Sequence, residues 1–359
     1  MTENKKKLLH IVEAMGGGIF TYLVDLTNEL VEQYEIYIAF AIHPQTPDNY
    51  RLYFDKRIHL IEVTHFTRAI NPYKDLKALQ EIKKIAKNIK PDIIHLHSSK
   101  AGVLGRIAFN AKKIPVFYTP HGYSFLMKDC SRVKRQIYRA IEAVCAKRNC
   151  TTISCSLGEH KETLKLTKKA VYVNNGINIK KLQNMLDGIE VKKHPFTVFT
   201  LGRICYQKNP SLFNEIAKAM PNIKFVWIGD GELRDELKEK NIEITGWVQR
   251  TDALTYAMNA DLFLLTSLWE GLPVSLLEAM YMRKPCVVSD VIGNHDVIQN
   301  EKNGYVCQEL SEYKRAIETI EYKETDELVD EAYKDILINF NTQIMAKRYH
   351  EKYSGDRKT

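Results

Sequence analysis

The sequence predicts an α/β protein with two doubly wound domains, and three observations carry that prediction. Short apolar runs typical of buried parallel strands alternate with segments of helical periodicity. Glycine-containing turns follow several of these runs, as expected where strands lead into helices. The alternation restarts near residue 196, and a chain of 359 residues suits two domains better than one.

The first half supplies the elements of one such domain. Strands are expected at residues 8–13, 35–42, 58–63, 91–97, 116–119, 151–154 and 171–173. Helices are expected at residues 19–31, 71–90, 104–112, 128–148 and 156–166. Residues 180–196 are polar and show no clear strand, so the N-terminal domain is expected to span residues 1–185.

The second half repeats the pattern. Strands are expected at residues 196–201, 224–228, 242–245, 262–265, 286–289 and 304–306. Helices are expected at residues 211–220, 233–240 and 253–260, and another should begin at Pro273. The C-terminal domain should span residues 186–335, and residues 336–359 should form a helix and tail that pack back toward the N-terminal domain. A ligand cleft is expected between two such domains.

Composition and cysteine usage indicate a soluble cytoplasmic protein. Apolar residues make up 45% and charged residues 27% of the chain. No apolar run approaches the ~18 to 20 residues that a membrane-spanning helix needs, and no secretory signal is recognisable. The seven cysteines are scattered without a C-x-x-C pair or a nearby histidine cluster, so reduced thiols are expected rather than disulfides or a zinc site.

Charge is distributed unevenly between the halves. Residues 1–180 contain 29 Lys and Arg against 16 Asp and Glu, whereas the remainder is mildly acidic. Such asymmetry is consistent with an anionic partner, which could be nucleic acid, phospholipid or a phosphorylated substrate. It could also reflect a drift in composition that has no function.

The segment at residues 128–148 is a basic amphipathic helix in this basic half. Val133, Ile137, Ile141 and Val144 form one apolar stripe, with basic residues around it. The pattern fits a helix lying on an anionic membrane, although a packed helix with a charged outer face is the commoner arrangement.

Polar and glycine residues follow the strands of the first domain, where ligands gather in doubly wound folds. By that rule the glycines at residues 16–18, the turn at residues 98–100 and His121 should converge. The glycines do not form the G-x-G-x-x-G pattern, which makes a dinucleotide site a poor explanation.

Three loops of the second domain together suggest a nucleotide-sugar site. Arg203 and Lys208 follow a strand and suit a diphosphate. Glu270 and Glu278 bracket a helix start whose N–H groups suit a phosphate, and the carboxylates suit sugar hydroxyls, although they could be a helix cap and a solvated face. Trp247 and Val248 offer an apolar wall for a base. No D-x-D motif occurs, so neither a metal nor another cofactor is expected.

The chain resembles the family 4 retaining glycosyltransferases of the GT-B fold, in particular their capsule and exopolysaccharide branch. The resemblance covers nearly the whole chain. It rests on the segments GGG (16–18), HLHSSKAGVLGR (95–106), YTPHGYSF (118–125), NNGIN (174–178), GRICYQKN (202–209), IGDGE (228–232) and EGLPVSLLE (270–278).

The resemblance implies roles for residues at these positions. Arg203 and Lys208 would bind the donor diphosphate, Glu278 the ribose, and Glu270 the donor sugar. Further donor contacts would come from the residues Gly17, Gly18, Gly271, Leu272, Pro273 and Val274, and from His121 as a second catalytic residue. The reaction would retain the anomeric configuration without an enzymic nucleophile.

The resemblance also implies partners and a location. The acceptor would be a polyprenyl-diphosphate-linked saccharide, contacted by Ser99, Lys100 and Tyr123, and no nucleic acid would be bound. The basic N-terminal domain would then touch the inner face of an anionic membrane. Two alternatives stay open at this point: a UDP-sugar 2-epimerase of the same architecture, and a non-catalytic nucleotide-sugar-binding subunit.

Overall fold

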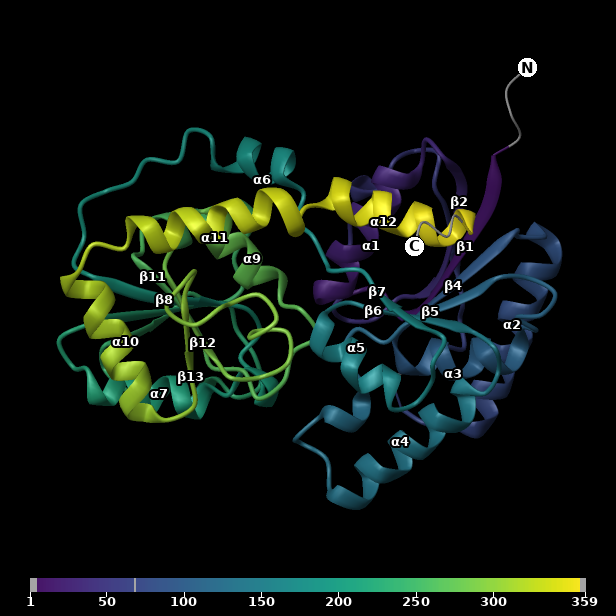
Figure 1. The fold of residues 1–359 in the computed structure, drawn as a ribbon, viewed down its shortest axis with the longest axis horizontal. Helices are drawn as coiled ribbons and strands as arrows, with labels where there is room; N and C mark the ends of the chain where they lie inside the picture. The colour runs from purple at the N-terminus through teal and green to yellow at the C-terminus, as the bar shows by residue number, and fades with distance from the viewer. Residues whose placement is uncertain (1–4, 68, 356–359) are drawn as a thin grey trace. The chain divides into compact units, whose positions relative to one another are not determined.

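A computed structural model describes residues 5–67 and 69–355 (Figure 1). The chain divides into two compact units. Unit 1 contains residues 1–126, 131–175 and 342–359, and unit 2 contains residues 127–130 and 176–341. The main division therefore falls between Asn175 and Gly176, earlier than the expected boundary at residue 185.

Unit 1 is built on a parallel sheet of seven strands among the described residues, in the order β3-β2-β1-β4-β5-β6-β7. Its strands are β1 (Lys6–Ala14), β2 (Tyr34–Ala41), β3 (His59–Glu62), β4 (Ile93–His97), β5 (Val116–Thr119), β6 (Thr151–Ser154) and β7 (Ala170–Tyr172). Its helices are α1 (Gly17–Leu30), α2 (Pro72–Ile89), α3 (Ser98–Ala108), α4 (Arg132–Ala146), α5 (Leu157–Leu164) and α12 (Thr342–Ser354), with short 3-10 turns η1 (Tyr50–Tyr53) and η2 (Ser124–Leu126).

Side-chain alternation along the strands of unit 1 builds a core on each face of its sheet. Leu8 and Val12 of β1 pack on the face covered by α1 and α12, whereas Leu9 and Ile11 pack on the face covered by α2 and α3. Helix α12 lies against α1 (Figure 1). The C-terminal helix therefore completes unit 1.

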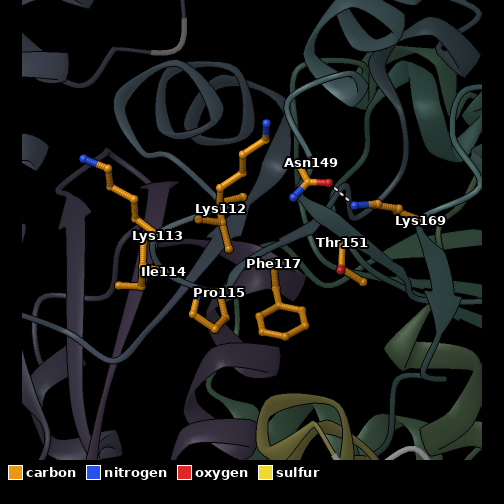
Figure 2. A pocket seen from close by; sticks show the side chains of 10 residues that line it. Lys112, Lys113, Ile114, Pro115, Phe117, Asn149, Thr151 and Lys169 are labelled. Carbon is orange, nitrogen blue, oxygen red and sulfur yellow. Dashed lines mark hydrogen bonds between the residues drawn. The ribbon is translucent and has the colours of Figure 1, made fainter.

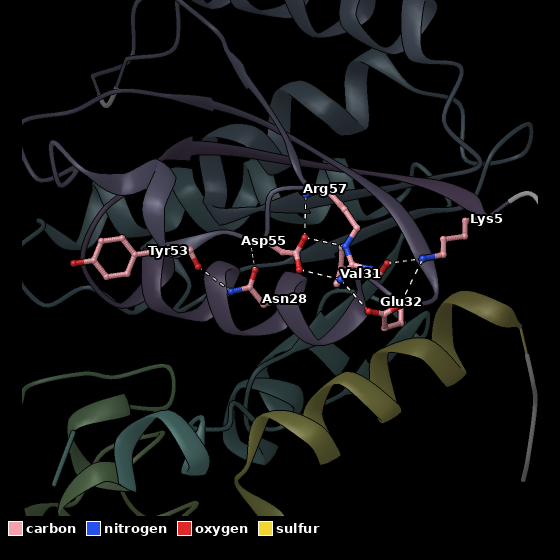
Figure 3. A network of polar contacts seen from close by, with 7 residues as sticks. All are labelled: Lys5, Asn28, Val31, Glu32, Tyr53, Asp55 and Arg57. Atoms are coloured by element: carbon pink, nitrogen blue, oxygen red, sulfur yellow. Dashed lines mark hydrogen bonds and ion pairs between the residues drawn. The ribbon is translucent and has the colours of Figure 1, made fainter. Parts of the chain in front are cut away.

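A polar network on the surface fastens the segment after β2 to the end of α1 (Figure 3). The Asn28 side chain donates to the Tyr53 carbonyl at 2.8 Å and accepts from the Asp55 N–H at 2.8 Å. The Arg57 guanidinium lies 2.9 Å from carboxylate oxygens of both Glu32 and Asp55. These contacts hold η1 over the helix without burying charge.

Unit 2 is built on a parallel sheet of six strands among the described residues, in the order β10-β9-β8-β11-β12-β13. The strands are β8 (Thr197–Leu201), β9 (Lys224–Ile228), β10 (Ile242–Ile244), β11 (Leu262–Leu265), β12 (Cys286–Ser289) and β13 (Tyr305–Cys307). The helices are α6 (Ile179–Leu186), α7 (Pro210–Ala219), α8 (Arg250–Met258), α9 (Val274–Tyr281), α10 (Leu310–Tyr322) and α11 (Asp326–Asn339), with 3-10 turns η3 (Tyr206–Lys208) and η4 (Arg234–Glu236).

Three expected elements differ from the structure. The helix expected at residues 104–112 begins at Ser98, directly after β4, because Ser98 (φ 68°) turns the chain at once. The helix expected at residues 233–240 is only η4, because the Lys238 and Glu239 N–H groups donate to the Asn214 side chain rather than continue a helix. The polar segment at residues 180–196, for which no helix was expected, contains most of α6, whose first turn the Asn178 side chain caps.

None of the helices within residues 5–67 and 69–355 combines the length and the apolar character needed to cross a bilayer.

Candidate active site

The strand exits singled out in unit 1 are neighbours in its sheet. Val12 of β1 pairs with His97 of β4, and His97 pairs with Thr119 of β5. Because all three strands are parallel, the glycines after β1, the turn after β4 and His121 after β5 leave the same edge. Gly17 (φ 55°) and Gly18 have open space where a Cβ would stand, so their backbone is accessible to a ligand.

His121 sits on a tight turn held by a buried carboxylate. The residue adopts a left-handed conformation (φ 56°), and Gly122 follows at φ 91°. The Gly122 N–H donates to Glu159 Oε1 at 2.6 Å, and the Cys155 N–H donates to Glu159 Oε2 at 2.8 Å. Glu159 is fully buried. Its position in the sequence gives no sign of this contact, because an acidic residue in the first turn of a helix is an ordinary feature.

Two further histidines that the sequence analysis passed over lie behind His121. His97 Nδ1 is 3.0 Å from His121 Nε2, and His97 Nε2 is 2.9 Å from His10 Nδ1. Burial lowers the pKa of His10 and of His121 to about 3, so both are neutral near pH 7. Their spacing in the strands could have revealed them. His10 pairs with His95, and His97 lies two residues after His95, so all three side chains point to the same face of the sheet.

The three residues of unit 1 that were expected to contact the acceptor differ in how far they are buried. Ser99 Oγ lies 2.9 Å from Ser124 Oγ and is partly buried. Lys100 Nζ lies 2.6 Å from Asp75 and also donates to the Ala69 carbonyl. The expected contact from Tyr123 is wrong for its side chain, which is 1% exposed within the core and whose hydroxyl contacts Thr163 at 2.9 Å.

In unit 2 the loop after β8 presents both expected cations. Gly202 (φ 147°) passes so close to β9 that a Cβ at Gly229 would meet its carbonyl at 2.2 Å. Arg203 Nε donates to Glu232 Oε2 at 2.8 Å, and both side chains are exposed. Lys208 lies farther along the loop and extends its side chain to Glu270. The two cations thus start from one loop but contact different carboxylates.

Glu270 is a buried carboxylate surrounded by hydrogen-bond donors. Oε1 accepts from Lys208 Nζ at 2.6 Å and from Ser267 Oγ at 2.7 Å, and Oε2 accepts from Gln207 Nε2 at 3.2 Å. The side chain of Glu270 is 8% exposed. These donors fix the carboxylate at the end of β11, so it is more than a solvated face or a helix cap.

Residues from a more distant loop support this turn, and no sequence motif marks them. Asn294 Nδ2 donates to Ser289 Oγ at 3.1 Å, and Ser289 Oγ donates to the Ser267 carbonyl at 2.6 Å. Gly293 (φ 88°) packs behind the turn, where a Cβ would meet the Gly271 carbonyl at 2.6 Å and Glu270 Cβ at 3.0 Å. Because only tertiary packing brings the loop after β12 to Glu270, no local sequence pattern predicts this contact.

The second expected carboxylate, Glu278, is also buried, and it contacts the Arg250 guanidinium. Arg250 begins α8 just after Trp247 and Val248. Trp247 is 71% exposed, which leaves its ring available for stacking. The Arg250 contact places the start of α8 beside α9.

The turn between the two carboxylates begins α9. Pro273 is the residue before the helix (φ −76°, ψ 120°), and Val274 is the first helical residue, so the helix begins one residue later than expected. The N–H groups of the first turn of a helix have no partner within the helix. Gly271 and Val274 are partly exposed, whereas Leu272 and Pro273 are buried.

A hollow of about 360 Å³ in unit 1 lies away from these strand exits (Figure 2). Its walls include Val116 and Thr151, which begin β5 and β6, and three exposed lysines, Lys112, Lys113 and Lys169. Ligands in doubly wound domains bind at the opposite, carboxyl ends of the strands. This hollow is therefore not the candidate active site.

Helix α4 presents its apolar stripe to solvent. Val133, Ile137, Ile141 and Val144 are 71%, 53%, 36% and 65% exposed. The helix is held instead by Glu142, which accepts from Arg106 at 2.6 Å and from the Tyr118 hydroxyl at 2.9 Å. Helix α4 is thus packed on unit 1 as one interpretation expected, but its outer face is apolar as well as charged.

A second hollow, of about 220 Å³, lies at the N-terminal part of α4. Phe125 and Leu126 form its apolar wall. Its charged walls come from three arginines and a carboxylate, namely Arg132, Arg135, Arg139 and Glu162. The Arg135 Nε is buried without a hydrogen-bond partner among the described residues. We refer to this hollow as the arginine pocket.

Both family models that match this chain describe glycosyltransferases. Residues 16–181 match the family "Glycosyltransferase Family 4", and residues 183–338 match "Glycosyl transferases group 1". A UDP-Gal:α-D-GlcNAc-diphosphoundecaprenol α-1,3-galactosyltransferase from Escherichia coli is 34% identical over 71% of this chain and 72% of its own length. An N,N'-diacetylbacillosaminyl-diphospho-undecaprenol α-1,3-N-acetylgalactosaminyltransferase from Campylobacter jejuni is 26% identical over 94% of this chain and 96% of its own.

Solved structures agree on the fold. Sucrose-phosphate synthase from Thermosynechococcus elongatus superposes with a TM-score of 0.82 at 16% identity, covering 98% of this chain and 99% of that one. HepE from Anabaena, solved with UDP and glucose, gives a TM-score of 0.77 at 17% identity, covering 97% and 99%. The related proteins support glycosyl transfer over an epimerase or a non-catalytic subunit. With two parallel-sheet units and these matches, the chain belongs to the family 4 glycosyltransferases of the GT-B fold.

Proposed function

We propose that this glycosyltransferase moves a sugar from a UDP-sugar to a polyprenyl-diphosphate-linked saccharide during assembly of a capsule, exopolysaccharide or other cell-surface glycan. The observation that carries the proposal is the buried Glu270 carboxylate, held by Lys208 beside the start of α9. The names of the E. coli and C. jejuni relatives support the lipid-linked acceptor, and the UDP bound to HepE supports the donor.

The donor would be held by residues of unit 2. Arg203 and Lys208 would bind the diphosphate together with the N–H groups of Gly271, Leu272 and Val274. Glu278 would accept hydrogen bonds from the ribose hydroxyls, and Glu270 would face the transferred sugar. Trp247 and Val248 would cover the base. His121 of unit 1 would hydrogen-bond to the transferred sugar, and Gly17 and Gly18 would admit the phosphates.

The reaction would retain the configuration at the anomeric carbon. The bond from that carbon to the leaving phosphate breaks, and a bond to the acceptor oxygen forms on the same face. The acceptor proton passes to the leaving phosphate, so no enzymic nucleophile is required. Lys208, Arg203 and the N-terminus of α9 would stabilise the charge that develops on the phosphate, and this arrangement would need no metal ion.

The acceptor would bind unit 1 at the membrane surface. The arginine pocket has side chains suited to a lipid diphosphate, and the exposed stripe of α4 lies along the same helix. We place α4 on an anionic bilayer with the stripe among the acyl chains and Arg132, Lys134 and Arg135 at the headgroups. The protein would then work peripherally at the inner membrane face.

A donor and acceptor screen tests the function. The full chain is incubated with a panel of nucleotide sugars, with and without polyprenyl-diphosphate-linked saccharides in vesicles. Release of nucleoside diphosphate only when an acceptor is present, with a retained linkage by NMR, is the expected result. Isomerised donor without release would instead indicate an epimerase, and the absence of any reaction across the panel would contradict the proposal.

A further inference from the structure

Three imidazole rings form a nearly coplanar row in unit 1, from the core to the carboxyl edge of the sheet. His10 Nδ1 lies 2.9 Å from His97 Nε2, and His97 Nδ1 lies 3.0 Å from His121 Nε2. The ring planes differ by 24° at the first contact and by 22° at the second. Short distances between nearly coplanar rings are the geometry of in-plane N–H···N hydrogen bonds.

Each ring of the row is neutral. Burial, reinforced by the neighbouring histidines, lowers the pKa of His97 well below its usual value, and burial lowers the pKa of His10 and of His121. A neutral imidazole has one N–H and one bare nitrogen. The proton position in one ring therefore dictates the position in the next, and only two arrangements satisfy both contacts.

The row is closed at its inner end. His10 Nε2 is buried and has no hydrogen-bond partner among the described residues. A row that ends there cannot pass a proton onward, so its function is to orient rather than to conduct. The arrangement that leaves a bare nitrogen at this position avoids a buried N–H donor without an acceptor, and such donors are rare in native structures. In that arrangement every N–H in the row is on Nδ1, and those of His10 and His97 point along the row toward His121.

A metal ion explains the cluster less well. His10, His95 and His97 lie close enough together to ligate one. However, His95 Nε2 contacts Thr119 at 2.9 Å and His95 Nδ1 contacts Tyr353 at 2.5 Å, and both nitrogens of His97 are used in the row. Among these three residues only His10 Nε2 has no partner, so hydrogen bonds already account for the arrangement.

We propose that His97 is a positioning residue, which with His10 behind it holds His121 as the neutral tautomer protonated at Nδ1. The inference rests on the proposed function, in which His121 contacts the transferred sugar. His97 Nδ1–H donates to His121 Nε2, so His121 keeps its own N–H on Nδ1 as the hydrogen-bond donor for a sugar oxygen. The left-handed turn at His121 orients the ring, and the row determines its proton.

The test compares tautomers and turnover in matched variants. In ¹⁵N-histidine-labelled full-length protein, His121 should show a protonated Nδ1 and a bare Nε2. His97→Phe should shift His121 toward the Nε2-protonated form and lower kcat on the order of tenfold, with the donor KM little changed. His97→Asn, whose amide nitrogen can stand where Nδ1 stood, should restore much of both signals. His10→Leu, which keeps the contact between His97 and His121, should have a smaller effect.

The outcomes separate this inference from the function on which it rests. Circular dichroism and UDP affinity, which depends on unit 2, first show that each variant is folded. A His121 tautomer that is unchanged in His97→Phe, or an Nε2-protonated His121 in the wild type, overturns the inference. Normal turnover in His121→Ala would instead overturn the assigned role of His121, while leaving the tautomer result intact.

Discussion

Lys208 Nζ lies 2.6 Å from Glu270 Oε1, and both side chains are largely buried at the carboxyl edge of the unit 2 sheet. The lysine fixes the orientation of the carboxylate, and under the proposed function it would also neutralise the leaving phosphate. The Thr266 hydroxyl strengthens the arrangement, because it donates to the Lys208 carbonyl at 2.8 Å and so ties the two loops together.

Glu270→Gln should lower kcat about 100- to 1,000-fold with a smaller change in donor affinity, because an amide cannot replace the charge of a carboxylate held by three donors. Steady-state transfer assays measure the effect. Glu243→Gln is the matched control, because Glu243 pairs with Lys224 on the exposed side of the same unit. Equal loss in both variants would remove the catalytic role from Glu270.

Arg203→Ala and Lys208→Ala should each weaken UDP binding about 10- to 100-fold, since a charge-assisted hydrogen bond contributes about 1.5 to 3 kcal/mol. Calorimetric titration measures the affinity, and Lys224→Ala controls for the loss of one positive charge in unit 2. Undiminished affinity in both site variants would place the diphosphate elsewhere.

Replacing Arg132, Arg135 and Arg139 together by Ser should weaken binding to anionic vesicles about 100-fold, because each basic residue near a charged bilayer contributes about 1 kcal/mol. Vesicle co-sedimentation measures this change. The control replaces Lys112, Lys113 and Lys169, which removes the same charge from the hollow in Figure 2. If the control loses as much binding as the arginine variant, the contact is a general charge effect and does not involve α4.

The apolar stripe gives a separate expectation. Val133→Ser with Ile137→Ser should weaken vesicle binding at constant charge and leave the thermal stability of the protein unchanged, because both side chains are exposed rather than packed. Reduced thermal stability would show that the stripe is covered by protein.

The buried pair that anchors α4 should matter for stability. Glu142→Gln leaves the Arg106 guanidinium buried without its counter-charge, and should lower the free energy of unfolding by about 3 to 5 kcal/mol. Urea unfolding measures the change, and Arg106→Met with Glu142→Leu should recover most of it. Glu32→Gln, in the exposed network of Figure 3, should change stability little.

Acid should destabilise unit 1 through its buried histidines. Their pKa values are lowered on folding, so the unfolded chain binds more protons, and stability falls as the pH drops below about 6.5 toward about 3. Each histidine that stays neutral costs about 1.4 kcal/mol per pH unit in that window. Chemical unfolding at pH 7.5 and 5.5 measures the slope, which His10→Leu should reduce. An unchanged slope would mean that His10 is not held neutral.

Local pattern was enough to predict part of the site. The apolar run of β11, the glycine turn and the helical spacing after it placed Glu270 and Glu278 correctly at the start of α9, to within one residue. Side chains whose role depends on packing were missed. Asn294 and Gly293 support Glu270 from another loop, and His10 and His97 have the pattern of ordinary strand residues until two strands are paired.

Two of the differences from expectation, one in an element and one at a site residue, have similar causes. The Asn214 side chain ends the helix expected at residue 233, and no residue of that segment encodes this contact. Tyr123 follows a strand exit beside His121, but its sequence position does not indicate whether the ring faces the core or the ligand.

Helix α12 supplies Met345, Ala346, Tyr349 and Tyr353 to the core of unit 1, and the Tyr353 hydroxyl contacts His95. Unit 1, which is synthesised first, consequently needs residues that are synthesised after all of unit 2 to complete its core. On the ribosome, unit 2 can close its own core first, while unit 1 stays incomplete until α12 emerges. Premature termination before Thr342 would therefore leave the earlier-made unit, rather than the later one, as the target of chaperones and proteases.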